Sequence, residues 1–292
     1  MTTALWWIRR DLRLTDNQAL AAALAHADRV IPVFVLDPTL LDSPYVGPKR
    51  VAFLLGGLRR LDEDLGARGS RLIVRRGDPQ DQLTALLKQC GAEAIFTEED
   101  FTPYARQRDS GVAKRLPLHL IGGRIVHPPG AVLKADGTPY TVFTPFRRRW
   151  KTLPPPQASV ISPAPERLST PPEVGSLPIP LEPMLPSTVP FPPGEAEAQR
   201  RLSAFVGGEY PPIYRYAEAR NRLDMDGTSR LSPYLHLGMV SSRQAVVAAL
   251  DAIATAPDAK ARVGAETWLH ELIWREFFVH ILYHFPHVLQ QS

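Results

Sequence analysis

Short apolar, β-branched runs alternate with longer segments of helical periodicity over the first 130 residues. This alternation is typical of a parallel sheet covered by helices, because neighbouring parallel strands must be joined by crossover segments. The expected strands are Ala4–Ile8, Arg29–Val35, Arg71–Val74, Ala94–Phe96 and Leu118–Ile121, with Arg124–His127 as a candidate sixth. The expected helices are Asn17–Ala27, Lys49–Gly66, Pro79–Cys90 and Pro103–Arg115. The sequence therefore predicts a Rossmann-like α/β domain over residues 1–130.

Arginines and an aspartate follow the first expected strand, where a dinucleotide-binding domain would carry its glycine fingerprint. We therefore do not expect NAD binding. Asp16 and Asp78 stand directly before the first and third expected helices. Because a carboxylate at that position can accept unpaired backbone N–H groups, we predict both residues as N-caps.

The stretch from Leu153 to Pro193 changes composition abruptly. It holds 14 of the chain's 30 prolines, among Ser, Thr and Glu, and shows no helical or strand period. Proline-rich segments are extended, so we expect this stretch to run over the surface of one domain on its way to the next. A disordered linker is the alternative. We assign residues 131–195 to this connector.

The pattern after Gly194 becomes helical. Three helices are expected, at Ala196–Phe205, Ser241–Ile253 and Gly264–Tyr283. We assign residues 196–292 to a partial helical domain. Because so few elements follow the connector, we expect the core of this domain to be unfinished.

The composition of the chain is that of an ordinary globular protein, with 44% hydrophobic and 22% charged residues. The apolar run at the N-terminus is too short for a signal peptide, and no stretch approaches a membrane span. We expect a cytoplasmic monomer with no membrane association. The single cysteine, Cys90, cannot form an internal disulfide and has no metal-ligand spacing around it, so we expect no metal site.

The net charge of +4 is compatible with a polyanionic partner but does not single one out. The densest basic run consists of Arg147, Arg148, Arg149 and Lys151. Such a run can contact phosphate, although short charge runs are more often solvated faces.

Three hydroxyls and a cation surround an expected helix start at Gly227–Leu235. Backbone N–H groups at a helix N-terminus point outward, and hydroxyls supply further donors to an anion. A phosphate-binding role is one interpretation. Ordinary helix capping by Ser and Thr is the other, and from the residues alone it is the more common one.

The segment Trp268–Phe278 combines indoles with charged side chains on one side of a helix. At 100° per residue, one third of the circumference holds Trp268, Glu271, Trp274, Arg275 and Phe278. Such a face suits a flat ligand with polar edges, because indoles offer stacking surface and a carboxylate accepts hydrogen bonds. A core helix with an ordinary Glu271–Arg275 pair is an equally good interpretation of these residues.

Four segments resemble the DNA photolyase and cryptochrome family, in the family's order. They are WIRRDLRLTDNQAL at 7–20, YTVFTPFRRRW at 140–150, GTSRLSPYLHLG at 227–238 and WLHELIWREFF at 268–278. The resemblance covers the whole chain, but only the antenna domain, the connector and the first part of the flavin domain of the family. It implies a cyclobutane pyrimidine dimer photolyase, a carbon–carbon lyase. In such an enzyme, excited reduced FAD passes an electron to a dimer flipped out of damaged DNA.

The resemblance also implies roles for individual residues. The positions that match FAD contacts are Tyr216, Thr228, Ser229, Arg230, Leu231, Ser232 and Trp268. Glu271 matches the carboxyl group that hydrogen-bonds the dimer, and Trp274 matches the indole that packs against it, so these two are the catalytic candidates. The residues expected to contact DNA are Arg220, Glu271, Trp274 and Arg275.

The chain departs from the family pattern in two places. In the antenna segment Phe101–Asp109, the Asn-Glu pair of folate-binding members is replaced by Tyr104 and Ala105. A deazaflavin, a folate or no antenna chromophore is therefore expected there. The rest of the family's isoalloxazine pocket lies beyond Ser292, so we expect the 292-residue chain to hold FAD weakly or not at all.

Three interpretations of function follow. The first is a photolyase whose activity this chain alone does not sustain, and the combination of Glu271 with Trp274 favours it. The second is a cryptochrome, a blue-light photosensor with the same fold and cofactor. The third is an inactive remnant whose α/β domain persists or binds a nucleotide-like ligand.

Overall fold

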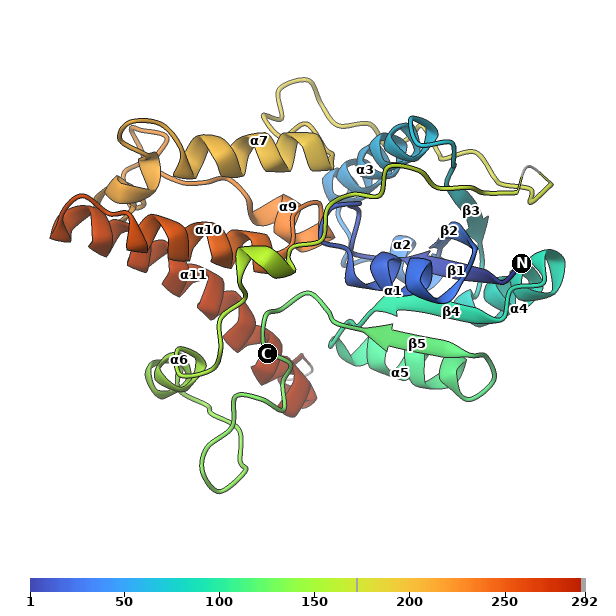
Figure 1. Ribbon diagram of the computed structural model, residues 1–292, viewed down its shortest axis with the longest axis horizontal. Coiled ribbons are helices and arrows are strands. Elements are labelled where there is room, and N and C mark those ends of the chain that lie inside the picture. The colour runs from blue at the N-terminus through green and yellow to red at the C-terminus, as the bar shows by residue number, and fades with distance from the viewer. Residues whose placement is uncertain (172, 290–292) are drawn as a thin grey trace.

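Five parallel strands form a single sheet near one end of the molecule, in the order β3-β2-β1-β4-β5 (Figure 1). The computed structural model describes residues 1–171 and 173–289. The strands are β1 (Thr3–Ile8), β2 (Arg29–Leu36), β3 (Ile73–Arg76), β4 (Ala94–Glu98) and β5 (Leu118–Ile121). The predicted parallel α/β fold is confirmed. The candidate strand at 124–127 does not form, because the backbone N–H groups of Val126 and His127 donate to the carboxylate of Glu276 instead.

Helices cover both faces of this sheet. They are α1 (Gln18–His26), α2 (Pro38–Leu41), α3 (Pro48–Gly66), α4 (Pro79–Cys90) and α5 (Pro103–Ala113). Asp78 caps α4 as predicted, by accepting hydrogen bonds from the backbone N–H groups of Gln80 and Asp81. The prediction that Asp16 caps α1 is wrong. Asn17 is the cap, and it accepts from the N–H of Leu20 at 2.9 Å.

The side chains of β1 alternate between the two faces of the sheet. Ala4, Trp6 and Ile8 are buried in a cluster with α1 and α3, and Leu5 and Trp7 are buried on the other face with α4 and α5. The first of these clusters continues without a break into the helices of the second half of the chain. The two halves therefore share one hydrophobic core.

The connector contains one α-helix, and its extended part follows that helix. The helix α6 (Phe143–Trp150) packs against α11, which lies in the second half of the chain. The extended part then follows the edge of the sheet beside β3 (Figure 1). There Leu177 N–H donates to the carbonyl of Val74 at 3.0 Å, and Val174 is buried. The expected course over a domain surface is therefore observed for the described part of the connector.

The second half of the chain is helical, as predicted. It contains α7 (Glu195–Val206), α8 (Tyr216–Ala219), α9 (Ser232–Leu237), α10 (Ser242–Ala254) and α11 (Ala259–His284). Short 3₁₀ turns occupy Ala158–Val160, Pro212–Arg215 and Pro286–Leu289. The helix α11 begins five residues before the predicted start, because Asp258 caps it by accepting from the N–H of Ala261.

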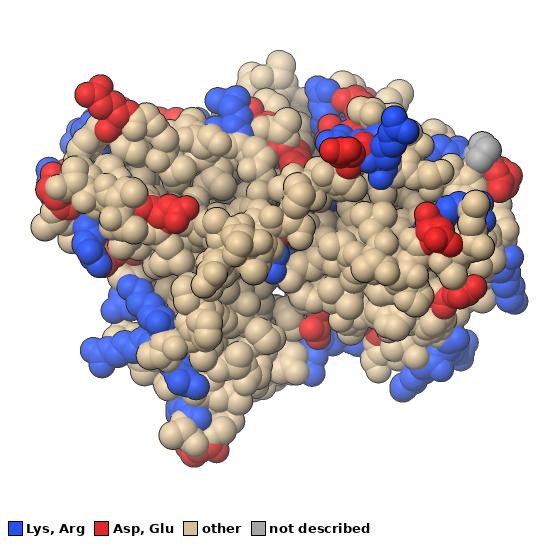
Figure 2. All heavy atoms as spheres, viewed as in Figure 1, with Lys and Arg blue, Asp and Glu red and all other residues tan. Residues whose placement is uncertain are grey.

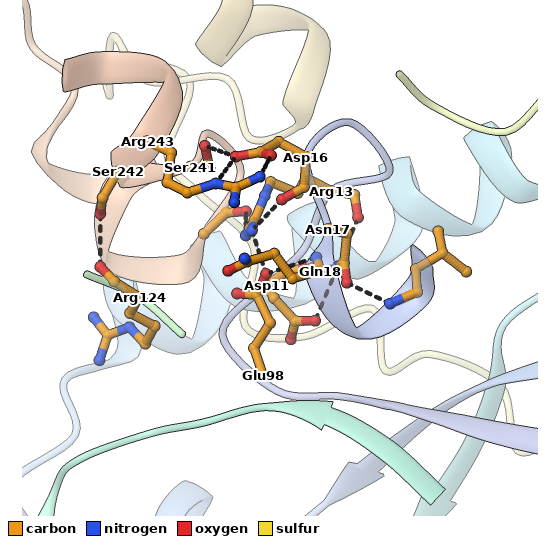
Figure 3. A network of polar contacts seen from close by, with 12 residues as sticks. Asp11, Arg13, Asp16, Asn17, Gln18, Glu98, Arg124, Ser241, Ser242 and Arg243 are labelled. Atoms are coloured by element: carbon orange, nitrogen blue, oxygen red, sulfur yellow. Dashed lines mark hydrogen bonds and ion pairs between the residues drawn. The ribbon is translucent and has the colours of Figure 1, made fainter. Parts of the chain in front are cut away.

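Buried charged side chains join the loop between β1 and α1 to the helices α9 and α10 (Figure 3). Arg13 forms an ion pair with Glu98 and donates to the carbonyl of Gly238 at 3.1 Å. Asp16 is fully buried, forms an ion pair with Arg243 and accepts from the hydroxyl of Ser241 at 2.5 Å. We call this group, with Asp11, Asn17 and Arg124, the interdomain seam.

Gly238 shows how closely the two halves approach at the interdomain seam. It lies at the end of α9 with a φ of +65°, a conformation that favours glycine. A Cβ atom there would overlap the backbone of Arg10 and Asp11. The backbone of Leu12 also donates to the carbonyl of Leu237 at 3.1 Å, so the two halves are joined by main-chain as well as side-chain contacts.

We predict that Asp16→Asn lowers the free energy of unfolding by about 3 kcal/mol, because it leaves the guanidinium of Arg243 without its buried carboxylate. Asn tolerates the positive φ of 55° at this position, so the change is electrostatic rather than conformational. Urea denaturation measures the effect. The matched control is Asp224→Asn, which breaks the exposed pair with Arg222 and should leave the midpoint unchanged. Equal midpoints for the two variants would show that the Asp16 pair does not hold the seam.

Candidate functional site

The helices α8 and α11 bring together three of the predicted site residues. The guanidinium of Arg220, just after α8, forms an ion pair with Glu271 on α11 and lies 6.0 Å from the ring of Tyr216. The side chains of Arg220 and Glu271 are 35% and 39% exposed, so this pair stands at the surface. Such a pair leaves both charges within reach of a ligand from solvent.

Tyr216 and Trp268 lie on the inner side of this region. Both are buried, and each packs against Phe205 of α7, with ring centroids 5.9 and 5.2 Å apart. Burial raises the pKa of the Tyr216 phenol, and the nearby charge of Glu271 adds to the effect. The two aromatic rings therefore support the surface that carries Arg220 and Glu271.

The predicted phosphate segment follows α8 along the chain. Gly227 packs so closely on the carbonyl of Ala219 that a side chain there would overlap it. Arg230 has a φ of +51° and pairs with Asp226 at 2.8 Å. Leu231 is the N-cap of α9 and provides no side-chain cap. In the described residues, no hydrogen bond within the chain involves the three hydroxyl groups of Thr228, Ser229 and Ser232. These hydroxyls are therefore open to a ligand rather than used as helix caps.

Trp274 points away from Glu271, toward α6. Its indole stacks on the ring of Phe143, with centroids 3.6 Å apart and planes 10° apart, and on Phe278 at 5.5 Å. Phe277 contacts it edge-on. The sequence predicted that these residues share one ligand-binding face of α11. The structure divides this face, with Glu271 beside α8 and Trp274 in an aromatic group beside α6. Phe143 was missed, because nothing in the local pattern says which residue α6 presents to α11.

Arg275 is directed into the molecule rather than toward the surface beside Trp274. Its guanidinium donates to the carbonyl groups of Arg124 at 2.6 Å and Leu235 at 3.1 Å, and to the hydroxyl of Ser242 at 2.8 Å. Burial lowers its pKa to about 10. These contacts connect α11 to the interdomain seam. The guanidinium of Arg275 therefore faces the interior and is not placed to contact DNA, contrary to the prediction.

Basic side chains gather around α6, beside the aromatic group of Trp274 (Figure 2). Arg147 contacts Nδ1 of His270 at 3.3 Å, and burial together with Lys151 and Arg147 lowers the pKa of His270 to about 4. Arg148 and Arg149 are exposed. The surface next to Trp274 is therefore positively charged.

Glu276 is a buried carboxylate that sequence reasoning missed. It accepts hydrogen bonds from the indole N–H of Trp150 at 2.6 Å and from the backbone N–H groups of Val126 and His127. Burial is the dominant influence, and it raises the pKa of this carboxyl group to about 7. Glu276 therefore fixes α6 and the segment before it on α11, which sets the position of Phe143 against Trp274.

A cavity of about 590 Å³ lies between the predicted antenna segment and the end of the chain. Its walls come from α5 and the residues before it, and from Tyr283 and Pro286. The guanidinium of Arg106 lies 4.1 Å from the centre of the Tyr283 ring and donates to the Tyr283 carbonyl. Tyr104 points elsewhere, toward Asp37, and burial with this carboxylate raises its pKa to about 12.

Among the described residues, no cluster of three His, Cys, Asp or Glu side chains is arranged to hold a metal ion. No helix within 1–171 and 173–289 has the length and apolar character needed to cross a bilayer.

Known proteins resemble this chain over nearly its whole length. A family model described as DNA photolyase matches residues 4–166. The deoxyribodipyrimidine photo-lyase of Synechococcus sp. (strain PCC 6301) is 38% identical, over 97% of this chain and 60% of that protein. An uncharacterized 31.6 kDa protein of Synechococcus sp. (strain PCC 6716) is 39% identical, over 94% of this chain and 98% of that protein. The crystal structure of a class III photolyase from Agrobacterium tumefaciens superposes with a TM-score of 0.88 at 27% identity, over 99% of this chain and 60% of that one. The chain thus spans about 60% of the length of the photolyases it matches.

We predict that Glu276→Gln changes how stability depends on pH. Because the folded-state pKa of Glu276 is raised from 4.5 to about 7, its stabilising contribution is complete below about pH 4.5 and is lost as the pH rises through 7. At about 1.4 kcal/mol per pKa unit, the free energy of unfolding should fall by about 3 kcal/mol more in the parent protein than in the variant across this window.

The measurement is urea denaturation at a series of pH values. Glu98, whose pKa burial also raises to about 7, is present in both proteins and cancels. Glu266→Gln, a half-buried glutamate on the same helix, serves as the control and should follow the parent protein. Parallel pH profiles for the parent protein and Glu276→Gln would contradict the assignment.

Proposed function

The chain belongs to the DNA photolyase family, and from that premise we propose that it takes part in light-driven repair of cyclobutane pyrimidine dimers in DNA. The observation that carries the proposal is the half-exposed Glu271, beside Arg220 and one helical turn from Trp274, on a surface flanked by basic side chains. A carboxylate for the base edges, an indole for stacking and cations for phosphate are what an extruded DNA lesion requires. The reaction class would be that of a carbon–carbon lyase.

FAD is the cofactor we propose, and the residues present fit it. The hydroxyl groups of Thr228, Ser229 and Ser232 make no hydrogen bonds within the described chain, so they are free to donate to a diphosphate. Arg230 adds a positive charge to the same segment. When bound and reduced, FAD would supply the electron that splits the dimer. Tyr216 and Trp268, which both pack against Phe205, would support the surface that faces the cofactor.

Glu271 is the residue we propose to hold the lesion. Its carboxylate can accept hydrogen bonds from the N–H groups of the pyrimidine bases. In the free protein this carboxylate is paired with Arg220, whose guanidinium can turn to a DNA phosphate when the bases take its place. One surface contact is thereby exchanged for two charge-assisted contacts to DNA.

Trp274 would pack against the dimer, but in the free protein its indole stacks on Phe143 and Phe278. Phe278 is 62% exposed, so it is the neighbour that can move with little loss of packing. The exposed cations around α6, Arg148 and Arg149, would bind the phosphates beside the lesion.

An antenna chromophore would occupy the 590 Å³ cavity between α5 and Tyr283. This volume lies within the range of small-molecule sites. Arg106 and Tyr283 would provide a cation and an aromatic ring for a flat heterocycle. Both a deazaflavin and a folate fit this description, and an absorbance spectrum of the purified protein distinguishes them.

We predict that Thr228→Val and Ser232→Ala each weaken FAD binding about tenfold, because each removes a hydrogen bond to a charged group. Equilibrium dialysis against FAD measures the change and detects weak binding. The control is Ser203→Ala, an exposed serine on α7 that should bind FAD like the parent protein. Unchanged affinity in both test variants would mean that this segment does not hold the diphosphate.

We predict that Glu271→Gln and Trp274→Ala each reduce the preference for damaged over undamaged DNA about tenfold, since stacking and base contacts act only on an extruded lesion. Fluorescence anisotropy in the dark, with duplexes that differ only in one thymine dimer, measures this ratio. Arg148→Gln should instead weaken binding to both duplexes equally and lower the salt dependence by about one unit. Glu266→Gln is the control on the same helix.

Repair itself is tested by illuminating the dimer-containing duplex with the protein and reduced FAD, and by measuring the loss of dimers. Dimer-selective binding without repair would contradict the lyase part of the proposal and retain the recognition part. Equal affinity for both duplexes in the parent protein would contradict recognition, and a light-sensing role would then explain the fold better.

A further inference from the structure

A small cavity lies at the interdomain seam, between the β1–α1 loop and the helices α9, α10 and α11. Its free volume is about 10 Å³, which is room for one small particle and not for a polyatomic anion. The lining residues are Arg10, Arg13, Gly123, Arg124, Leu235, Gly238, Val240, Ser241, Ser242 and Arg275. Four of them are arginines, two are serines and none is acidic.

The four guanidinium groups donate mostly to neutral acceptors. Arg10 and Arg124 donate to the carbonyl of His236 at 3.2 and 3.3 Å. Arg13 donates to Gly238 O, and Arg275 donates only to carbonyl and hydroxyl oxygens. These contacts satisfy N–H donors, but a carbonyl group carries no net charge to balance a buried cation.

Two carboxylates form ion pairs with three of the four arginines, and the carboxyl groups of Asp11 and Glu276 act electrostatically on Arg13 and Arg275. Asp100 lies 3.5 Å from Arg10 and 3.7 Å from Arg124, so it is shared between them. Glu98 pairs with Arg13, and the nearby Asp16 is paired with Arg243. The side chains that line the cavity are therefore neutral or positively charged, and the carboxylates lie outside this lining.

His236 stands beside the same arginines. Its ring lies 3.0 Å from a guanidinium nitrogen of Arg10. Burial, and then the charges of Arg10, Arg124, Arg275 and Arg50, lower the pKa of His236 to about 3. The part of this shift that comes from these four arginines has the sign that also favours an anion.

We propose that this cavity binds one monovalent anion of the size of chloride. The Nε atoms of Arg13 and Arg124 are buried and have no hydrogen-bond partner in the described structure, so donors are available to it. The free volume excludes phosphate and sulfate, and a water molecule would fill the space without balancing the charge. The proposal does not depend on the repair function.

The position of the cavity gives the anion a structural consequence. Arg10, Arg13 and Arg124 come from the α/β half, whereas Ser241, Ser242 and Arg275 come from the helical half. An anion between them attracts both halves and screens the repulsion among their arginines. Halide binding should therefore strengthen the contact between the two halves and raise the free energy of unfolding of the chain.

The direct test is a crystal grown or soaked in sodium bromide, because bromide replaces chloride and is located by its anomalous scattering. We expect an anomalous peak in the cavity, with the guanidinium groups around it. Density for water alone in the cavity, with bromide peaks only at the surface, would overturn the proposal.

Thermal unfolding provides the second test. At constant ionic strength, replacing gluconate by chloride should raise the melting temperature in a saturable way, by about 3 °C. Arg275→Gln keeps a donor for Leu235 O but removes the charge, so its melting temperature should not respond to chloride. Arg222→Gln, an exposed arginine far from the cavity, is the control and should respond like the parent protein. If Arg275→Gln does not fold, Ser242→Ala takes its place and should show a weaker response. A parent protein that unfolds at the same temperature in both salts would contradict the proposal.

Discussion

Buried charge at the interdomain seam is the constraint on which the arrangement of the two halves depends. Arg13 and Asp16 follow β1, but their partners lie on both sides of the seam, in Glu98, Gly238 and Arg243. A buried charge without a partner costs several kcal/mol, so neither half can turn away from the other without exposing these groups to that cost. The residues after β1 lack the glycines of a nucleotide site and form part of the interdomain seam instead. The loop that in other α/β proteins faces a ligand here faces α9 and α10.

The position of helix α11 depends on the interdomain seam, and this helix carries most of the candidate functional surface. Arg275 holds it to the seam, and Glu276 holds α6 and the segment before it. Ahead of these two residues on the helix, Glu271 and Trp274 project toward α8 and α6. Different sides of one helix therefore fix its position and form the candidate functional surface. A change at Arg275 or Glu276 would move Glu271 and Trp274 together.

Most of the fold could be predicted from the sequence because strands and helices are set by local periodicity. The bounds of α4 and β5 agree with the prediction, and the parallel order follows from the crossovers. The failures involve long-range partners. Asp16 has the composition of a helix cap, but Arg243, 227 positions later, takes its carboxylate. The apolar run at 124–127 has the composition of a strand, but Glu276 binds its N–H groups. For the candidate site, the sequence predicted one face of α11, which the structure divides between α8, α6 and the interdomain seam. Phe143 and Glu276 were not predicted, because neither has a signal within its own segment.

Burial divides the ion pairs of this protein into those that can open and those that cannot. The pair of Arg220 with Glu271 is more than one third exposed on both sides, and pairs of that kind contribute about 0–1 kcal/mol. Under the proposed function, phosphate and base contacts from DNA would therefore displace it. Breaking a buried pair such as Asp16 with Arg243 costs about 3–5 kcal/mol, which exceeds what one DNA contact provides. If DNA binds as proposed, it should rearrange side chains at the surface of α8 and α11 and leave the relation of the two halves unchanged. The geometry that a bound chromophore would require would then be unaffected by lesion binding.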